Sequence, residues 1–325
     1  MKTALDASYE VGGVSIGLQC DDPEVVALVD SRFRPLRRGI GPATDITIEI
    51  RGPGEAAGWL PPPSGTGRPI YDAPGQPIEY FDATDELYID YGGQVRLLCS
   101  LSEGRISLAI NGTDPGDAIL ATHPMLTIAL VETMKRFGRF SLHAAGLSLG
   151  GRGVLVPGSS GSGKSTLTVT LVRAGFDFLS DDTVFLEPTT EGIWVSGFPD
   201  EVDVTDTTVS MVPELAHLAH RPLRPGREKH GFRIEDVFDT TVVAGCRPVA
   251  LVAPHLVEGV GPRLEPLSAG EALLQLMPNV LLTDPKASQA HLDVLGELAR
   301  TIPCYRFSPG SDLPAAADRL RELLT

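Results

Sequence analysis

The sequence predicts a two-domain chain in which a β-rich domain of α+β type, residues 1–116, precedes an α/β domain, residues 117–325. Runs of alternating apolar and polar residues, typical of antiparallel strands, dominate the first third. From residue 140 onward, strand-like and helix-like runs alternate instead, which is the pattern of an α/β fold. The length of 325 residues also exceeds the roughly 300 that one hydrophobic core usually supports.

Each element of the first domain follows from local pattern. We expect a helix that begins near Pro23 and antiparallel strands over 9–20, 45–50, 86–91, 94–101 and 105–110. Gly92-Gly93 lies between two alternating runs and predicts a hairpin. Residues 51–77 are rich in glycine and proline, so they predict an irregular surface loop.

The second domain opens with helical periodicity over 117–137, which Pro124 is expected to divide. A strand over 141–149 should run antiparallel to the next, 153–157, through a turn at 150–152. Further strands are expected at 176–180, 183–187, 248–254 and 304–307, and helices at 164–174, near 269–277, near 285–300 and at the C-terminus.

Charge and composition exclude several classes of function. Lys and Arg number 27 and Asp and Glu 42, so the net charge is −15. This balance argues against sequence-independent binding to nucleic acid or to an anionic membrane. The first residues do not resemble a secretory signal, and no apolar run is long enough for membrane insertion. The four cysteines are widely separated, which predicts isolated buried thiols in a cytoplasmic protein.

The strongest motif is GSSGSGKS, residues 158–165, which fits the pattern G-x-x-x-x-G-K-[ST] between a predicted strand and a predicted helix. Glycines let consecutive backbone N–H groups face an anion at the positive end of a helix. Lys164 would add a charge against the β- and γ-phosphates, and the Ser165 hydroxyl would bind Mg²⁺. We therefore predict an ATP site formed by Gly158, Ser159, Ser160, Gly161, Ser162, Gly163, Lys164, Ser165 and Thr166.

A pair of carboxylates follows at Asp181 and Asp182, directly after the strand 176–180. One helix and one strand separate the pair from Lys164, so the pair should return to the edge of the sheet that carries the glycine-rich loop. Two neighbouring carboxylates allow one to bind metal while the other takes a proton from a hydroxyl. The alternative is an ordinary Asp-Asp turn.

Two further features are less specific. His143 lies in the predicted strand 141–149, and the strand pattern alone favours a core or edge histidine. Residues 217–233 carry five cations against one acid, and their prolines and glycines predict a loop. This segment is expected to close over the phosphates, with Lys229 or Arg233 reaching the site; the alternative is a solvated loop or a subunit contact.

Taken together, LHAAG (142–146), the glycine-rich segment and FLSDD (178–182) resemble the catalytic core of the HPr kinase/phosphorylase family. In the same order they also resemble the more distant ATP-dependent phosphoenolpyruvate carboxykinases. The resemblance covers about residues 117–325 and implies a P-loop kinase core. It implies Asp181 as general base, Asp182 near Mg²⁺ with Ser165, and His143 lining the site. Residues 198–203 match the family only loosely, so HPr itself is not the expected substrate.

The function expected from the sequence is therefore an ATP- and Mg²⁺-dependent kinase that acts on a hydroxyl, such as Ser or Thr of a peptide or small protein. A natural-product precursor peptide is one such substrate. Two alternatives stay open: a kinase of a free amino acid or metabolite, and a non-catalytic ATP-gated binding or regulatory protein. The sequence leaves open whether the chain forms a homo-oligomer.

Overall fold

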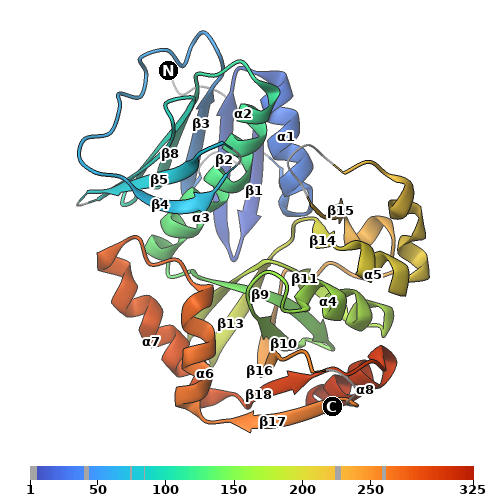
Figure 1. Cartoon of the computed structure of the whole chain (residues 1–325). Helices are drawn as coiled ribbons and strands as arrows, with labels where there is room; N and C mark the ends of the chain where they lie inside the picture. The colour runs from blue at the N-terminus through green and yellow to red at the C-terminus, as the bar shows by residue number, and fades with distance from the viewer. Residues whose placement is uncertain (1–5, 40–43, 74, 84, 224–227, 258–260) are drawn as a thin grey trace. The chain divides into compact units, whose positions relative to one another are not determined.

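The structure is a computed structural model that describes residues 6–39, 44–73, 75–83, 85–223, 228–257 and 261–325. The chain forms two compact units (Figure 1): residues 1–139 with 281–289, and residues 140–280 with 290–325. The division after residue 139 lies later than the boundary at 116 expected from the sequence. The helical segment belongs to the first unit because α3 (Leu126–Met134) packs on β7 (Val95–Ser100).

The first unit contains a mixed sheet with strand order β1-β2-β3-β8-β7-β6-β5-β4. The β2–β3 and β3–β8 pairs are parallel and the others antiparallel. The hairpin predicted at Gly92-Gly93 is present, and Tyr91 pairs with Val95 across it. The remaining elements are β1 (Ala7–Val11), β2 (Val14–Cys20), α1 (Pro23–Phe33), β3 (Ile46–Arg51), β4 (Arg68–Asp72), β5 (Pro77–Asp82), β6 (Glu86–Tyr91), β8 (Arg105–Ile110) and α2 (Pro115–Leu120).

Three expectations for this unit are wrong in part. The strand expected at 45–50 is not antiparallel to its neighbours, because β3 pairs in parallel with both β2 and β8. The run 9–20 is two strands rather than one, because Gly12 and Gly13 take positive φ and reverse the chain. Residues 51–77 are not irregular throughout, since β4 lies within this segment and pairs with β5 at the sheet edge. Glycine and proline there obscured the strand pattern, although the partner strand β5 follows only a few residues after β4. The helical segment is divided at Pro124 as predicted, because His123 has an extended backbone.

The second unit is built on a sheet of order β10-β9-β12-β13-β16-β18-β17, in which β11 also pairs with β9 and β10 also pairs with β16. Three strands run parallel, namely β10, β16 and β18. The predicted antiparallel turn between β9 and β10 is present. The strands are β9 (Phe140–Leu149), β10 (Arg152–Pro157), β11 (Asp177–Ser180), β12 (Thr183–Thr189), β13 (Gly192–Phe198), β16 (Gly245–Pro254), β17 (Arg263–Leu267) and β18 (Cys304–Ser308).

Helices cover both faces of this sheet. Residues of α4 (Lys164–Arg173) and α8 (Leu313–Leu324) share one apolar core with Val154 and Val156 of β10. On the other face, α6 (Ala269–Leu276) and residues 294–299 of α7 (Pro285–Thr301) pack around Leu155. Figure 1 shows α4 and α8 on one side and α6 and α7 on the other. Successive side chains of β10 therefore point to opposite faces of the sheet, so this strand contributes to both apolar cores.

Between β13 and β16, the described residues of the second unit form β14 (Val202–Val204), α5 (Asp206–Met211), a 3₁₀ helix over Pro213–His220 and β15 (His230–Phe232), which pairs with β14. The expected loop at 217–233 is therefore partly wrong, because apolar Leu215 and Leu218 are buried and fix the 3₁₀ helix. Arg224 and Arg227 of this segment lie outside the described residues.

Two expectations from composition can be compared with the structure. Cys20, Cys99, Cys246 and Cys304 are all buried free thiols, as predicted. Within the described ranges, every helix is too short or too polar to cross a membrane.

Candidate functional site

The sheet register brings the three sequence motifs together around β9. His143 is the last residue of β9 that pairs with β12, opposite Thr183, and Ala144 is the first that pairs with β10, opposite Pro157. Pro157 leads directly into the glycine-rich loop, and Thr183 directly follows the acidic pair. The loop and the carboxylates therefore flank His143 because β9 changes its partner at this point.

The glycine-rich loop joins β10 to the N-terminus of α4. Gly161 and Gly163 have φ of 85° and 93°, which side-chain-bearing residues rarely adopt. Gly163 is the N-cap, so no side chain accepts a hydrogen bond from the first N–H groups of α4. Those groups and the helix dipole give the loop the character of an anion site.

Lys164 is buried beneath this loop. Its Nζ donates to the carbonyls of Gly158 and Ser159 and lies 3.0 Å from Nε2 of His143. Burial lowers the pKa of Lys164, and the carboxylates Asp182 and Asp181 partly oppose that effect. An ammonium has only donors, so Nε2 of His143 must accept, and the imidazole proton therefore lies on Nδ1.

Asp182 is the partner of that proton. Its Oδ1 lies 3.1 Å from Nδ1 of His143, and its Oδ2 accepts from the Thr183 hydroxyl at 3.0 Å. The crowded surroundings oppose ionisation, but the hydrogen bonds from His143 and Thr183 and the charge of Lys164 together outweigh them and hold the pKa of Asp182 well below its usual range. The side chain is 57% exposed, so an incoming molecule can reach this carboxylate.

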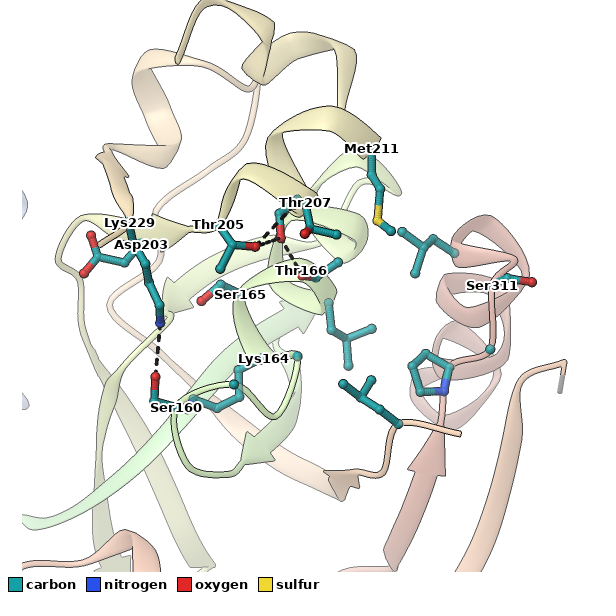
Figure 2. A pocket seen from close by; sticks show the side chains of 18 of the residues that line it. Ser160, Lys164, Ser165, Thr166, Asp203, Thr205, Thr207, Met211, Lys229 and Ser311 are labelled. Carbon is teal, nitrogen blue, oxygen red and sulfur yellow. Dashed lines mark hydrogen bonds between the residues drawn. The ribbon is translucent and has the colours of Figure 1, made fainter. Parts of the chain in front are cut away.

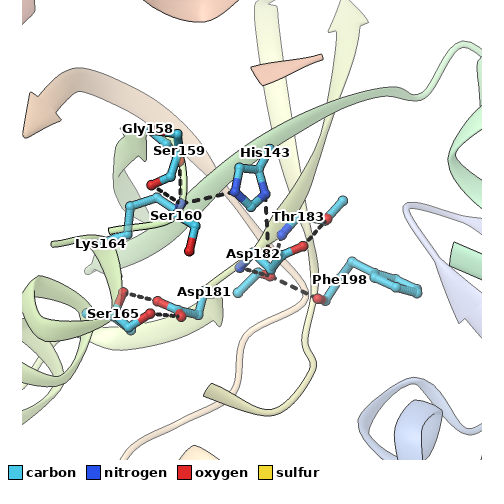
Figure 3. A network of polar contacts seen from close by, with 12 residues as sticks. His143, Gly158, Ser159, Ser160, Lys164, Ser165, Asp181, Asp182, Thr183 and Phe198 are labelled. Atoms are coloured by element: carbon cyan, nitrogen blue, oxygen red, sulfur yellow. Dashed lines mark hydrogen bonds and ion pairs between the residues drawn. The ribbon is translucent and has the colours of Figure 1, made fainter. Parts of the chain in front are cut away.

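Asp181 faces the opposite way, toward α4 (Figure 3). The Ser165 hydroxyl donates to its Oδ2 at 2.6 Å and the Thr168 hydroxyl to its Oδ1 at 2.5 Å. Burial raises the pKa of Asp181 to about 6, although both hydroxyl hydrogen bonds act in the other direction. The two adjacent carboxylates thus occupy separate environments, one buried against Ser165 and one exposed beside His143.

The raised pKa of Asp181 predicts a pH dependence of stability. The folded protein holds this proton more tightly than the unfolded chain, so the contribution is complete below pH 3.8 and is lost as the pH rises through about 6. The difference between the ordinary pKa of 3.8 and the raised pKa of about 6 corresponds to roughly 3 kcal/mol of unfolding free energy. In denaturant titrations without Mg²⁺ or nucleotide, wild type should lose about that much unfolding free energy relative to Asp181→Asn between pH 4 and 7.

The matched control for this measurement is Asp318→Asn, which removes an exposed carboxylate from α8. Its unfolding free energy should follow that of wild type across the same range. Parallel profiles for wild type and Asp181→Asn would contradict the raised pKa.

The basic segment reaches the loop through one of the two predicted cations. Lys229 Nζ donates to the Ser160 hydroxyl at 3.2 Å. Arg233, in contrast, bonds from Nε to Glu235 at 2.9 Å, and its side chain is only 10% exposed. Arg233 is therefore held by a neighbouring carboxylate and is not among the described residues that line the cavity beside the loop.

That cavity, of about 790 Å³, lies along the loop and the first turn of α4 (Figure 2). The three parallel strands β10, β16 and β18 all direct their C-terminal ends toward it, which is the usual location of a ligand site in an α/β sheet. Sequence reasoning missed the residues that follow two of these strands, together with those of α5: Leu256, Pro309, Gly310, Ser311, Leu313, Pro314, Thr205, Thr207, Thr208 and Met211.

Sequence reasoning also missed Thr168. A signal for this residue was available, because Thr168 lies three residues after Ser165 and therefore on the same face of the helix. The residues beyond β16 and β18 carry no comparable local signal, since only the strand order brings them to the loop.

Comparisons with known proteins add little to this geometry. No family model matches the chain, and comparison with curated proteins gave no match. Among solved structures, the chain is similar to one described as the structure of the Hpr(Ser) kinase/phosphatase from Coxiella burnetii. The TM-score is 0.32 and the identity 18%, over 56% of this chain and 90% of that chain. Agreement at this level is too low to assign a function, so the site's own geometry carries the proposals below.

Proposed function

We propose that this protein is an ATP- and Mg²⁺-dependent kinase that transfers the γ-phosphoryl group to a hydroxyl. The observation that carries the proposal is the division of the acidic pair around the loop. One carboxylate, Asp181, is bound to the Ser165 hydroxyl, and the other, Asp182, is exposed beside His143 and Lys164. A phosphoryl-transfer site needs a metal-side carboxylate, a cation for the phosphates and a group that receives the acceptor proton.

The donor set beside the loop suits Mg²⁺. Ser165 Oγ and the Asp181 carboxylate are hard oxygen donors at hydrogen-bond distance from each other. In the described part of the chain, no cluster of three or more His, Cys, Asp or Glu side chains could hold a metal alone. Mg²⁺ ordinarily takes one or two protein ligands together with phosphates and waters, so Ser165 and Asp181 would hold it. When bound, it would neutralise charge on the phosphates.

The remaining roles belong to side chains. Lys164 would exchange its bonds to the Gly158 and Ser159 carbonyls for phosphate oxygens. Asp182 would accept the proton of the acceptor hydroxyl while the new O–P bond forms and the bond to the ADP oxygen breaks. His143 would keep Asp182 in place through its Nδ1–H.

This assignment exchanges the roles of the two carboxylates that the resemblance implied. Both oxygens of Asp181 already accept hydrogen bonds from α4 hydroxyls, and the residue is buried against that helix. Asp181 is 6% exposed, whereas the side chain of Asp182 is 57% exposed. Access decides which carboxylate can receive a proton, so the geometry favours Asp182 as the base.

For the acceptor we propose Ser or Thr of a peptide or small protein, which the sequence resemblance favours. Purified protein should be incubated with MgATP labelled in the γ-phosphate and a panel of Ser- and Thr-containing peptides, free amino acids and sugars. Label should appear on a hydroxyl above the background of the Lys164→Ala variant. Transfer to a free amino acid alone would identify a small-molecule kinase. Absence of transfer to every acceptor, with ATP still bound, would support the regulatory alternative.

A further inference from the structure

The cavity beside the glycine-rich loop has two chemically different ends (Figure 2). One end, next to the loop, is polar and carries the ammonium groups of Lys164 and Lys229 and the hydroxyl of Ser160. At the other end, large apolar side chains come from three separate elements: Met211, Leu256, Pro309, Leu313 and Pro314. A volume of about 790 Å³ is within the range of small-molecule sites, roughly 300–1,000 Å³.

The apolar end is unusually exposed for its composition. Met211 is 54% exposed and Leu256 is 61% exposed, although both line the same cavity. Large apolar side chains gathered at a concave, solvent-facing site are typical of a surface that a ligand covers. Leu256 also lies against the loop itself, because a Cβ added to Gly163 would come within 3.3 Å of Leu256 Cδ2.

The wall formed by α5 is attached to the loop helix by a hydroxyl network. Thr166 Oγ1 lies 2.8 Å from Thr208 Oγ1, and Thr208 lies 3.4 Å from the Thr205 hydroxyl. The Thr205 hydroxyl also accepts from the N–H of Thr208 and caps α5. Met211 is therefore carried on a helix whose N-terminus is hydrogen-bonded to the first turn of α4, so the apolar end and the phosphate end form one built site.

We propose that the apolar end of this cavity binds the base of the nucleoside triphosphate. The inference rests on the proposed function, which places the phosphates at the loop. His143, Asp181 and Asp182 are not among the described residues that line the cavity. The γ-phosphate must face Asp182 for transfer, so the opposite end of the nucleotide extends away from the acidic pair and into the cavity. An acceptor seated at Met211 and Leu256 would lie among described lining residues that include neither carboxylate of the acidic pair.

The test compares two probes that share phosphates and differ in the base. Calorimetry should give the affinities of MgATP and of magnesium tripolyphosphate for wild type, Leu256→Ser and Met211→Ala. We expect each variant to bind MgATP about tenfold more weakly, because apolar contact with the base is lost. Affinity for magnesium tripolyphosphate should change less than twofold. Leu274→Ser is the matched control, since Leu274 is 67% exposed on α6 of the same unit.

Each outcome separates this inference from the proposed function. If wild type binds MgATP no more tightly than tripolyphosphate, or if both pocket variants retain wild-type affinity for MgATP, the base site is overturned while phosphoryl transfer can still stand. If the variants lose MgATP affinity but no acceptor is ever phosphorylated, the base site stands and the kinase proposal fails. Failure of wild type to bind either probe overturns both.

Discussion

Replacing Lys164 by alanine is expected to lower the rate of phosphoryl transfer about a thousandfold and to weaken the binding of MgATP. The charge developing on the transferred group must be stabilised by a preorganised cation, and loss of one such donor typically costs 10²- to 10³-fold or more. Lys164 is the loop's buried cation, in contact with His143 and two loop carbonyls. Transfer should be measured as initial rates at saturating acceptor and ATP.

Denaturant titration separates a loss of folding from a loss of catalysis. The free energy of unfolding of Lys164→Ala should be measured beside that of wild type, because the variant also removes the hydrogen bonds of Lys164 to two loop carbonyls. Lys286→Ala, at an exposed lysine of the first unit, is the control and should retain wild-type rates. If Lys164→Ala transfers phosphoryl groups at a rate within tenfold of wild type, the glycine-rich loop does not take part in the reaction.

Local pattern was sufficient for the elements that carry the loop. An apolar run, a glycine cluster and helical periodicity predict the strand before Gly158 and the helix from Lys164. The structure contains both elements. The antiparallel turn between β9 and β10 follows from Gly150 and Gly151 in the same way. Strands such as β14 and β17 depend on partners far along the sequence, β15 and β18, and their composition alone did not indicate them.

The sequence could also predict that the acidic pair returns to the loop, but not which carboxylate does what. Asp181 and Asp182 lie in a bend between β11 and β12, so the alternation of a strand does not fix where their side chains point. The register of β11 against β9 also shifts between Phe178 and Ser180, and no local signal in the sequence announces that irregularity. The strand pattern likewise misled on His143, whose position beside Lys164 comes from the change of partner along β9.

The separation of the two carboxylates predicts opposite consequences for two conservative variants. Asp182→Asn keeps the shape of the side chain and its hydrogen bond from Nδ1 of His143, but it removes the group that would receive the acceptor proton. Loss of general-base catalysis typically costs 10²- to 10⁴-fold, so we expect kcat to fall about a thousandfold. MgATP affinity should change less than threefold, because the phosphates lie with Lys164 and Ser165.

Asp181→Asn should act instead through the metal. It weakens a carboxylate bound to the Ser165 hydroxyl, so the Mg²⁺ concentration for half-maximal rate should rise about tenfold or more. At saturating Mg²⁺, Asp181→Asn should regain much of its rate. The rate of Asp182→Asn should stay low under the same conditions. Titration of initial rate against Mg²⁺ for both variants measures this difference. If Asp181→Asn stays inactive at saturating Mg²⁺ while Asp182→Asn keeps kcat, the buried carboxylate is the base and the exposed one only positions His143.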